Sequence, residues 1–249
     1  MSGATLLEAL ALPPEVRVDR RVAKKLLLEQ GAPTAADKRI IQDGVDDLYW
    51  IAALKPSNIG VPAFRDSTCD YGEIAVLTVA LRSSAKARLT ELIHRAIPYP
   101  VLLISAQGDV VYCSLVHKRF SQGKAGKVVL DGDVVSERLL SGNGVEADFL
   151  AAMALSRQRA KDLRDLYQGW MERLVALTTA RITGIYGVSA SDEGNRDRRE
   201  ALQAHKGLTK QLAALHTLAA KEKQLNRRVE LNLEISRLEK SLNDVYSRL

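Results

Sequence analysis

The sequence predicts an α+β fold, in which a small mixed α/β domain at 1–140 precedes a long helical hairpin or coiled coil at 145–249. Three observations predict this fold. Before residue 140, helical periodicity alternates with short runs of β-favouring apolar residues. Gly142-Asn143-Gly144 has the composition of a linker. From Asp197 to Leu249 there is no proline and Gly207 is the only glycine, which is typical of a long helix.

The first half contains an ordered series of helix and strand signals. A short helix at 20–30 is expected to end at Gly31, and Thr34 is a suitable N-cap for a helix at 35–53. Apolar residues of that helix recur at spacings of three and four, which predicts one buried face. The later signals predict, in order, a buried strand at 73–82, a helix at 85–97 capped by Ser84, a strand at 100–106, a turn at 107–109, and strands at 110–117 and 127–130.

The second half is predicted to be helical. One helix is expected at 146–181, and a second follows a Gly- and Ser-rich break at 183–195. Because a helix as long as the second cannot bury its apolar residues alone, it either folds back on 146–181 or pairs with another chain. We expect the hairpin, and the same apolar residues allow a homodimer through the C-terminal helix. These residues form a seam with heptad spacing at Leu208, Leu212, Leu215 and Ala219, and again at Leu231, Ile235, Leu238, Leu242, Val245 and Leu249.

The composition is that of an ordinary globular protein, with 46% hydrophobic and 27% charged residues. No apolar run approaches the ~20 residues that a membrane-spanning helix needs. The first residues lack the basic start of a secretory signal, and two cysteines are too few for a disulfide framework. We therefore expect a cytoplasmic protein without membrane contact. The net charge of +6 permits contact with nucleic acid or an acidic partner, although it is also typical of a solvated basic surface.

Motifs of the common catalytic and cofactor sites are missing from the sequence. It contains no dinucleotide-binding fingerprint, no phosphate-binding loop and no nucleophile elbow, and its four histidines lack metal-ligand spacing. We therefore expect no cofactor and no bound metal. The weak catalytic candidates are Asp66, Asp70 and Glu73, because carboxylates beside a strand can hold the Mg²⁺ of a nuclease. Such nucleases carry an acid and a lysine where this chain has Ala80 and Arg82, so a nuclease is only the alternative interpretation.

A basic segment of the last helix is the main binding candidate. Its cations, Lys221, Lys223, Arg227 and Arg228, lie on neighbouring helical turns, where each can contact a phosphate group. Aromatic residues that would stack on bases are missing from this segment, which argues against base-specific reading of single strands. Two polar residues of the predicted seam, Asn226 and Asn232, either set the register with a docked partner or form a polar layer inside the hairpin.

Several segments together resemble one known family. They are 20–28 with 45–50, the run 73–82, the segment Ala96-Ile97-Pro98-Tyr99-Pro100-Val101-Leu102, and above all Glu222-Lys223-Gln224-Leu225-Asn226-Arg227-Arg228-Val229-Glu230-Leu231-Asn232. Over nearly its whole length the chain is similar to the bacterial domain-of-unknown-function 4391 family, which has no established activity. Its members are often encoded beside helicases and DNA methyltransferases of restriction-like or phage-defence loci. The resemblance therefore implies an accessory role in DNA defence.

The leading interpretation is a non-catalytic accessory protein of a DNA-processing or phage-defence system. It is expected to dock a helicase or DNA methyltransferase, or DNA itself, through its basic C-terminal helices. The alternatives are a degenerate or unusual metal-dependent nuclease in the N-terminal domain and a purely structural, self-associating protein. Capture of a partner, Mg²⁺-dependent cleavage and the mass in solution discriminate among the three.

Overall fold

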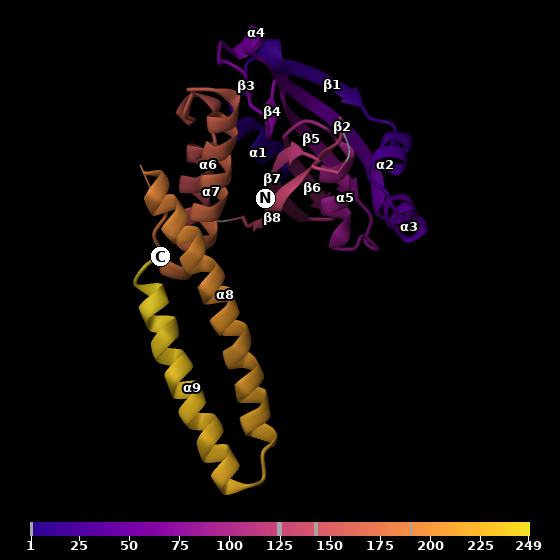
Figure 1. Ribbon diagram of the computed structural model, residues 1–249. Helices are drawn as coiled ribbons and strands as arrows, with labels where there is room; N and C mark the ends of the chain where they lie inside the picture. Colours follow the sequence, from indigo (N-terminus) through magenta and orange to yellow (C-terminus); the bar gives the residue numbers. More distant parts are fainter. Residues whose placement is uncertain (1, 124–125, 142–143, 190) are drawn as a thin grey trace. The chain divides into compact units, whose positions relative to one another are not determined.

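The computed structural model describes residues 2–123, 126–141, 144–189 and 191–249 (Figure 1). The fold is mixed α/β, and its internal contacts divide it into two compact units, Met1–Leu177 and Thr178–Leu249. The division falls inside helix α7 (Leu163–Thr183), whereas the sequence predicts a domain boundary between 140 and 145. The predicted linker positions Gly142 and Asn143 lie outside the described residues.

The first unit is organised by a six-stranded sheet with the order β1-β2-β5-β6-β7-β8. Strands β5 and β6 are parallel, and all other neighbouring pairs are antiparallel. A separate two-stranded sheet pairs β3 with β4. The strands are β1 (Arg17–Arg21), β2 (Val45–Leu54), β3 (Phe64–Arg65), β4 (Asp70–Tyr71), β5 (Ile74–Leu81), β6 (Val101–Gln107), β7 (Val110–Phe120) and β8 (Val128–Leu139).

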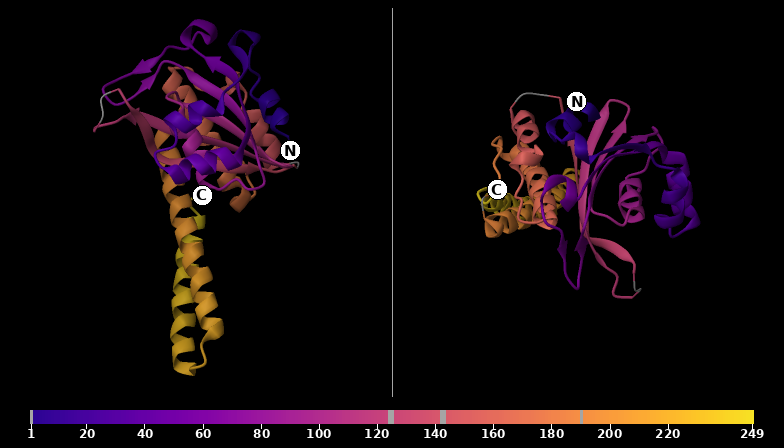
Figure 2. Two further views of the ribbon diagram at one scale, coloured as in Figure 1. Left: turned by 90° about the vertical axis from the view of Figure 1, so that its right-hand side faces the viewer. Right: turned by 90° about the horizontal axis from the view of Figure 1, so that it is seen from above.

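Helices cover both faces of the large sheet (Figure 2). One face packs against α2 (Lys24–Gln30), α3 (Ala35–Gly44) and α5 (Arg88–Ala96), and Leu77 and Leu103 of the sheet lie in the shared apolar core. The other face carries α1 (Gly3–Ala9), α6 (Val145–Ala152) and α7. Short helical turns at Pro14–Val16, Pro56–Ile59 (α4) and Leu155–Arg157 complete the unit.

Several predicted elements of the first unit are confirmed. Strands β5 and β6 occupy the predicted segments, and a turn at Gly108 joins β6 to β7 with a φ of 57°, which favours glycine. The Thr34 hydroxyl accepts a hydrogen bond from the Asp37 N–H and so caps α3 as predicted. Trp170 of α7 is fully buried, as expected for a large aromatic residue on the apolar face of a helix.

Other predictions for the first unit are wrong. The helix predicted at 35–53 ends at Gly44, because Val45–Leu54 pairs with β1 and β5 as strand β2. The segment predicted as a helix at 20–30 begins as strand β1, and only its second part is helical. Helix α5 starts at Arg88 with Ala87 as its N-cap, so Ser84 does not cap it. The last strand is longer than predicted and continues through 131–133, and the helix predicted at 146–181 is divided into α6, a helical turn and α7.

The second unit contains two helices, α8 (Asp192–Lys221) and α9 (Leu225–Tyr246), where the sequence predicts one. The chain leaves helical geometry at 222–224, and the two helices run side by side in opposite directions (Figures 1 and 2). Leu212, Leu231 and Ile235 of the predicted apolar series are its most buried members, at 6–8% exposure. These three residues lie where α8 and α9 contact each other.

Candidate functional site

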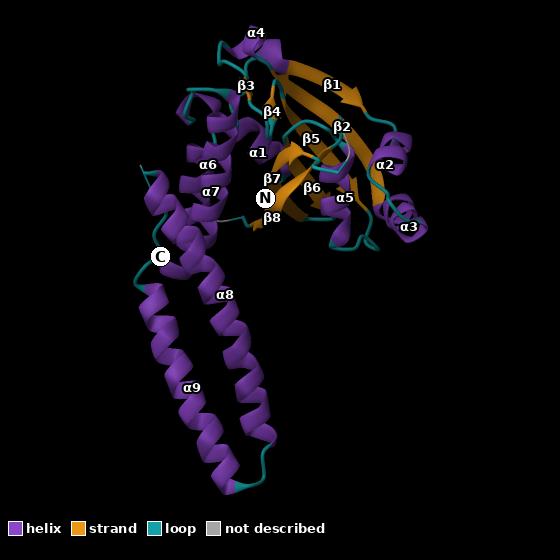
Figure 3. Cartoon of the chain, viewed as in Figure 1, coloured by secondary structure: helices purple, strands orange, loops and turns teal. Residues whose placement is uncertain are grey.

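The predicted basic residues lie at the connection between α8 and α9. Figure 3 shows this connection as the loop that joins the two helices. Lys221 ends α8, Lys223 lies in the connection, and Arg227 and Arg228 stand in the first turn of α9. We call these four residues the basic cluster, and all four are exposed. The sequence places them on successive turns of one helix, whereas the structure places them around the end of a helix pair.

Three apolar side chains beside the basic cluster form an exposed line along α9. Leu225 is 64% exposed, Val229 50% and Leu233 57%. Their spacing of four residues puts them on one side of the helix. Residues two apart on a helix are separated by about 200°, so this apolar stripe lies opposite Leu231 and Ile235, which are buried.

Residue spacing alone does not separate the apolar stripe of Leu225, Val229 and Leu233 from the predicted seam. Its signal is present in the spacing of Leu225, Val229 and Leu233, which are offset from the predicted seam. If 197–249 formed one long helix, the offset of these three residues from the heptad positions would be read as an interruption of the heptad pattern. Only the pairing of α8 with α9 shows that this second row of apolar residues is left exposed.

The two asparagines predicted for the seam are also exposed. Because water reaches both Asn226 and Asn232, they do not form a polar layer between α8 and α9. Near them, Arg227 donates to Glu230 at 2.7 Å, the pair that their helical spacing predicts. The hydrogen bond and the charge of Glu230 raise the pKa of Arg227.

The weak catalytic candidates each serve a separate local contact. Asp66 accepts hydrogen bonds from the N–H and hydroxyl of Thr68 and from the N–H of Cys69, at 2.7–2.8 Å. These bonds, that of the Thr68 hydroxyl first, lower the pKa of Asp66 to about 2. Asp70 pairs with Arg65, and the Glu73 carboxylate lies 3.0 Å from Lys55 Nζ.

The structure does not assemble these carboxylates into a metal site. Within the described ranges, no three His, Cys, Asp or Glu side chains are arranged to hold a metal ion. A metal-dependent reaction needs convergent oxygen ligands. The three acids instead stabilise the loop and strand ends around β3, β4 and β5.

A partly buried polar network that the sequence does not predict connects the sheet to α7. Tyr71 Oη lies 2.5 Å from His117 Nδ1, and His117 Nε2 lies 2.7 Å from Gln168 Oε1. Gln168 Nε2 then donates to Glu172, which also accepts from Arg159. Burial raises the pKa of Tyr71, so the phenol stays protonated. Long sequence separation between β7 and α7 hides this network from local sequence patterns.

A second buried polar group lies under the other face of the sheet. Lys118 Nζ donates to the carbonyl oxygens of His94, at 2.7 Å, and Ile97 at the end of α5. Burial lowers the pKa of Lys118 to about 7. It also lowers the pKa of His94 to about 3, and His94 Nε2 lies 3.0 Å from Ser114 Oγ. Lys118 serves the C-terminus of α5, where orphaned carbonyls need donors.

Comparison with known proteins identifies the family. No curated protein and no solved structure matches the chain significantly. In the part of the chain that the structure describes, each helix is too short or too polar to cross a membrane. The family model described as a domain of unknown function, DUF4391, matches residues 10–242, which is nearly the whole length. The chain therefore belongs to the domain-of-unknown-function family DUF4391.

Proposed function

We propose that this protein is a non-catalytic accessory subunit of a bacterial DNA-processing or phage-defence system, and that α8 and α9 form a coiled-coil hairpin that docks its partner. The apolar stripe of Leu225, Val229 and Leu233 beside the basic cluster is the observation that carries the proposal. Large apolar side chains in a row on an exposed helix favour burial against another surface.

The chemistry of this surface indicates which properties its partner needs. The stripe needs an apolar groove, and the basic cluster needs acidic side chains around that groove. Family members are encoded near helicases and DNA methyltransferases, so an enzyme of one of these classes, in the cytoplasm, is the proposed partner. Arg227 is already paired with Glu230, which leaves Lys221, Lys223 and Arg228 to contribute most of the charge attraction.

The test is a tagged pull-down from the native host with nuclease treatment and mass spectrometry. Wild-type protein is expected to recover a helicase or DNA methyltransferase in stoichiometric amount. A stripe variant (Leu225→Ser, Val229→Ser, Leu233→Ser) and a basic variant (Lys223→Glu, Arg227→Glu, Arg228→Glu) should each lose it. In the purified complex we expect affinity losses of at least about tenfold, or about 1.4 kcal/mol.

A charge-matched control separates the surface from net charge. Arg237→Glu, Lys240→Glu and Arg248→Glu change exposed positions of α9 and its end, away from the basic cluster. This control should recover the partner as the wild type does. The proposal is contradicted if the stripe variant and the basic variant each recover as much partner as the wild type does. A wild-type dimer that the stripe variant turns into a monomer assigns the stripe to self-association, and recovery only without nuclease treatment assigns the surface to DNA.

A further inference from the structure

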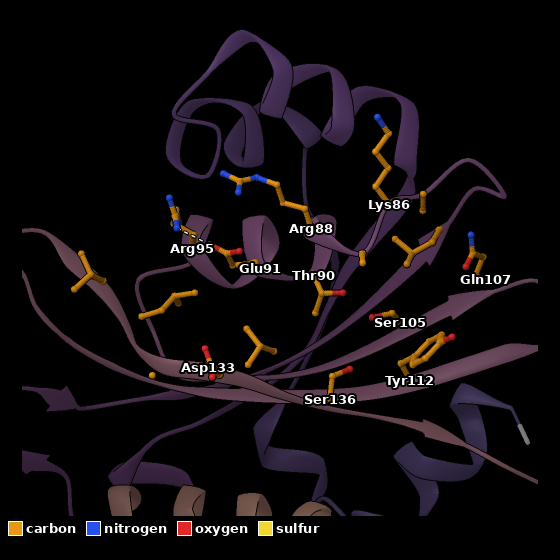
Figure 4. A pocket seen from close by; sticks show the side chains of 17 residues that line it. Lys86, Arg88, Thr90, Glu91, Arg95, Ser105, Gln107, Tyr112, Asp133 and Ser136 are labelled. Carbon is orange, nitrogen blue, oxygen red and sulfur yellow. Dashed lines mark hydrogen bonds and ion pairs between the residues drawn. The ribbon is translucent and has the colours of Figure 1, made fainter. Parts of the chain in front are cut away.

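A groove lies between α5 and strands β6, β7 and β8, far in the sequence from the docking surface (Figure 4). Helix α5 packs over β5 and β6 and leaves part of the β7–β8 surface beside it open. The groove has a volume of about 990 Å³, and ligand sites for small molecules reach this size.

The floor of the groove holds a buried hydroxyl without a partner. Ser105 is 2% exposed, and its Oγ makes no hydrogen bond to any described residue. Figure 4 shows Ser105 beside the same space as Thr90 of α5 and Ser136 of β8. A buried hydroxyl without a hydrogen bond lowers stability. A ligand that bonds Ser105 would remove this cost.

One end of the groove favours an anion. Because β5 and β6 are parallel, their carboxyl ends lie at the same edge, where α5 begins. Among the described residues, no side chain caps the N-terminus of α5, and the first N–H groups of this helix carry partial positive charge. Gln107 Nε2 donates to the carbonyl oxygens of Arg82 and Ser83 and holds the connection that leads to this helix. Ligands of α/β sheets bind at such carboxyl ends.

Some of the charged side chains along the groove are ion-paired and others are not. Arg88 is bonded to Asp37 at 2.6 Å, and Arg95 is bonded to Glu91 at 2.6 Å. Among the described residues, Lys86 at the first end and Asp133 below Arg95 make no ion pair. The groove therefore offers a helix N-terminus at one end, hydroxyls in its middle and a carboxylate at the other. The exposed Lys86 side chain extends from the start of α5 away from Ser105 (Figure 4), and its flexible stem lets the ammonium turn toward a phosphate group at that helix N-terminus.

We propose that this groove binds a mononucleotide. The phosphate group would lie at the N-terminus of α5 near Lys86, and the sugar hydroxyls or a base amino group would donate to Asp133. Ser105 and Thr90 would bond the middle of the ligand, and Leu130 and Val134 of β8 supply apolar contact for the base. The same chemistry is present in a free nucleotide and at the 5′-phosphorylated end of a DNA strand.

Isothermal titration of the full chain tests the proposal with AMP, GMP, CMP and UMP. At least one of them is expected to bind more tightly than its nucleoside and than inorganic phosphate. Lys86→Ala should weaken the nucleotide about tenfold and leave the nucleoside unchanged, and Ser105→Ala should weaken both about tenfold. The exposed Lys38→Ala on α3 is the matched control and should bind as the wild type does.

The stability of the variants keeps the test decisive. Removing the partnerless hydroxyl in Ser105→Ala should leave the melting temperature equal or higher, so weaker binding cannot come from unfolding. A 5′-phosphorylated deoxytetranucleotide that binds better than the mononucleotides supports the site and assigns it to a strand end. Absence of binding at millimolar nucleotide, equal binding of phosphate alone, or unchanged affinity in both variants overturns the proposal.

Discussion

Lys118 makes the stability of the first unit depend on pH in a way that one substitution removes. The ammonium is buried, with the residue 4% exposed, and it donates to two carbonyl oxygens at the end of α5. Burial lowers its pKa to about 7 from the ordinary 10.5. Replacing it in Lys118→Met keeps a long apolar stem and removes the titrating group.

The sign and size follow from proton linkage. Between pH 7 and the ordinary pKa of lysine, the unfolded chain binds more protons than the folded chain at this position. The free energy of unfolding therefore rises with pH across this window, and below it the contribution is constant. With a folded pKa of 7, the rise between pH 7 and 8.5 is about 1.6 kcal/mol, from 1.36 kcal/mol per pH unit.

Urea unfolding at several pH values from 6 to 8.5 measures this contribution. Fluorescence of Trp50 and Trp170 reports on the first unit, which contains both tryptophans. The wild type minus Lys118→Met difference in unfolding free energy should rise by about 2 kcal/mol from pH 6 to 8.5, of which about 1.6 kcal/mol falls between pH 7 and 8.5. The difference cancels other titrating groups, such as Cys113, whose pKa burial raises to about 12 and whose contribution has the opposite sign.

The control for a lost positive charge is Lys38→Met, at an exposed position of α3. It is expected to follow the wild-type curve with pH. Parallel curves for the wild type and Lys118→Met would refute the reasoning, because they would mean that the buried ammonium has the same proton affinity in the folded and unfolded chain.

Three further changes test the packing and the loops of the first unit. Tyr167→Phe removes the hydroxyl that bonds the backbone of β6 and β7 at 2.8–3.1 Å. In urea unfolding, this change should lower the unfolding free energy by about 1–3 kcal/mol. A loss no larger than that of Tyr49→Phe, at an exposed position, contradicts this expectation. Gly31→Ala places a Cβ 2.6 Å from the Leu92 carbonyl oxygen and should cost about 1–3 kcal/mol, whereas Gly207→Ala, which meets nothing within 4 Å, should not lower the melting temperature. Because hydrogen bonds lower the pKa of Asp66 to about 2, the wild type should lose stability as pH falls from 4 to 2, and an Asp66→Asn variant whose acid unfolding curve equals the wild-type curve would exclude this contribution.

Short-range sequence signals correctly predict those elements whose own residues favour the conformation that the fold gives them. The apolar β-branched run of β5 has the composition of a buried strand, and Gly108 has the freedom that the β6–β7 turn requires. Thr34 caps α3 through a bond to an N–H three residues away, so sequence spacing contains all the necessary information.

Tertiary pairing decides the conformation of those segments whose local sequence pattern predicts another element. Residues 45–54 have apolar spacing that also fits a helix, but hydrogen bonds to β1 and β5 make them a strand. Strand β1, Arg-Val-Asp-Arg-Arg, has no apolar alternation and is extended because β2 pairs with it. The segment Glu222-Lys223-Gln224 contains neither Gly nor Pro, and α8 ends there because its apolar series packs against that of α9.

The features of the candidate sites likewise divide into those that the sequence predicts and those that depend on tertiary contacts. The mixed α/β class, the family resemblance, the apolar series of the last helices and the residues of the basic cluster can all be predicted from the amino-acid sequence, because they depend on residue type and short spacing. The three-dimensional fold, in contrast, is needed to see that Leu225, Val229 and Leu233 stay exposed and that Ser105, Thr90 and Asp133 border one groove. Burial and convergence depend on contacts between residues far apart in the chain, and no local pattern specifies those contacts.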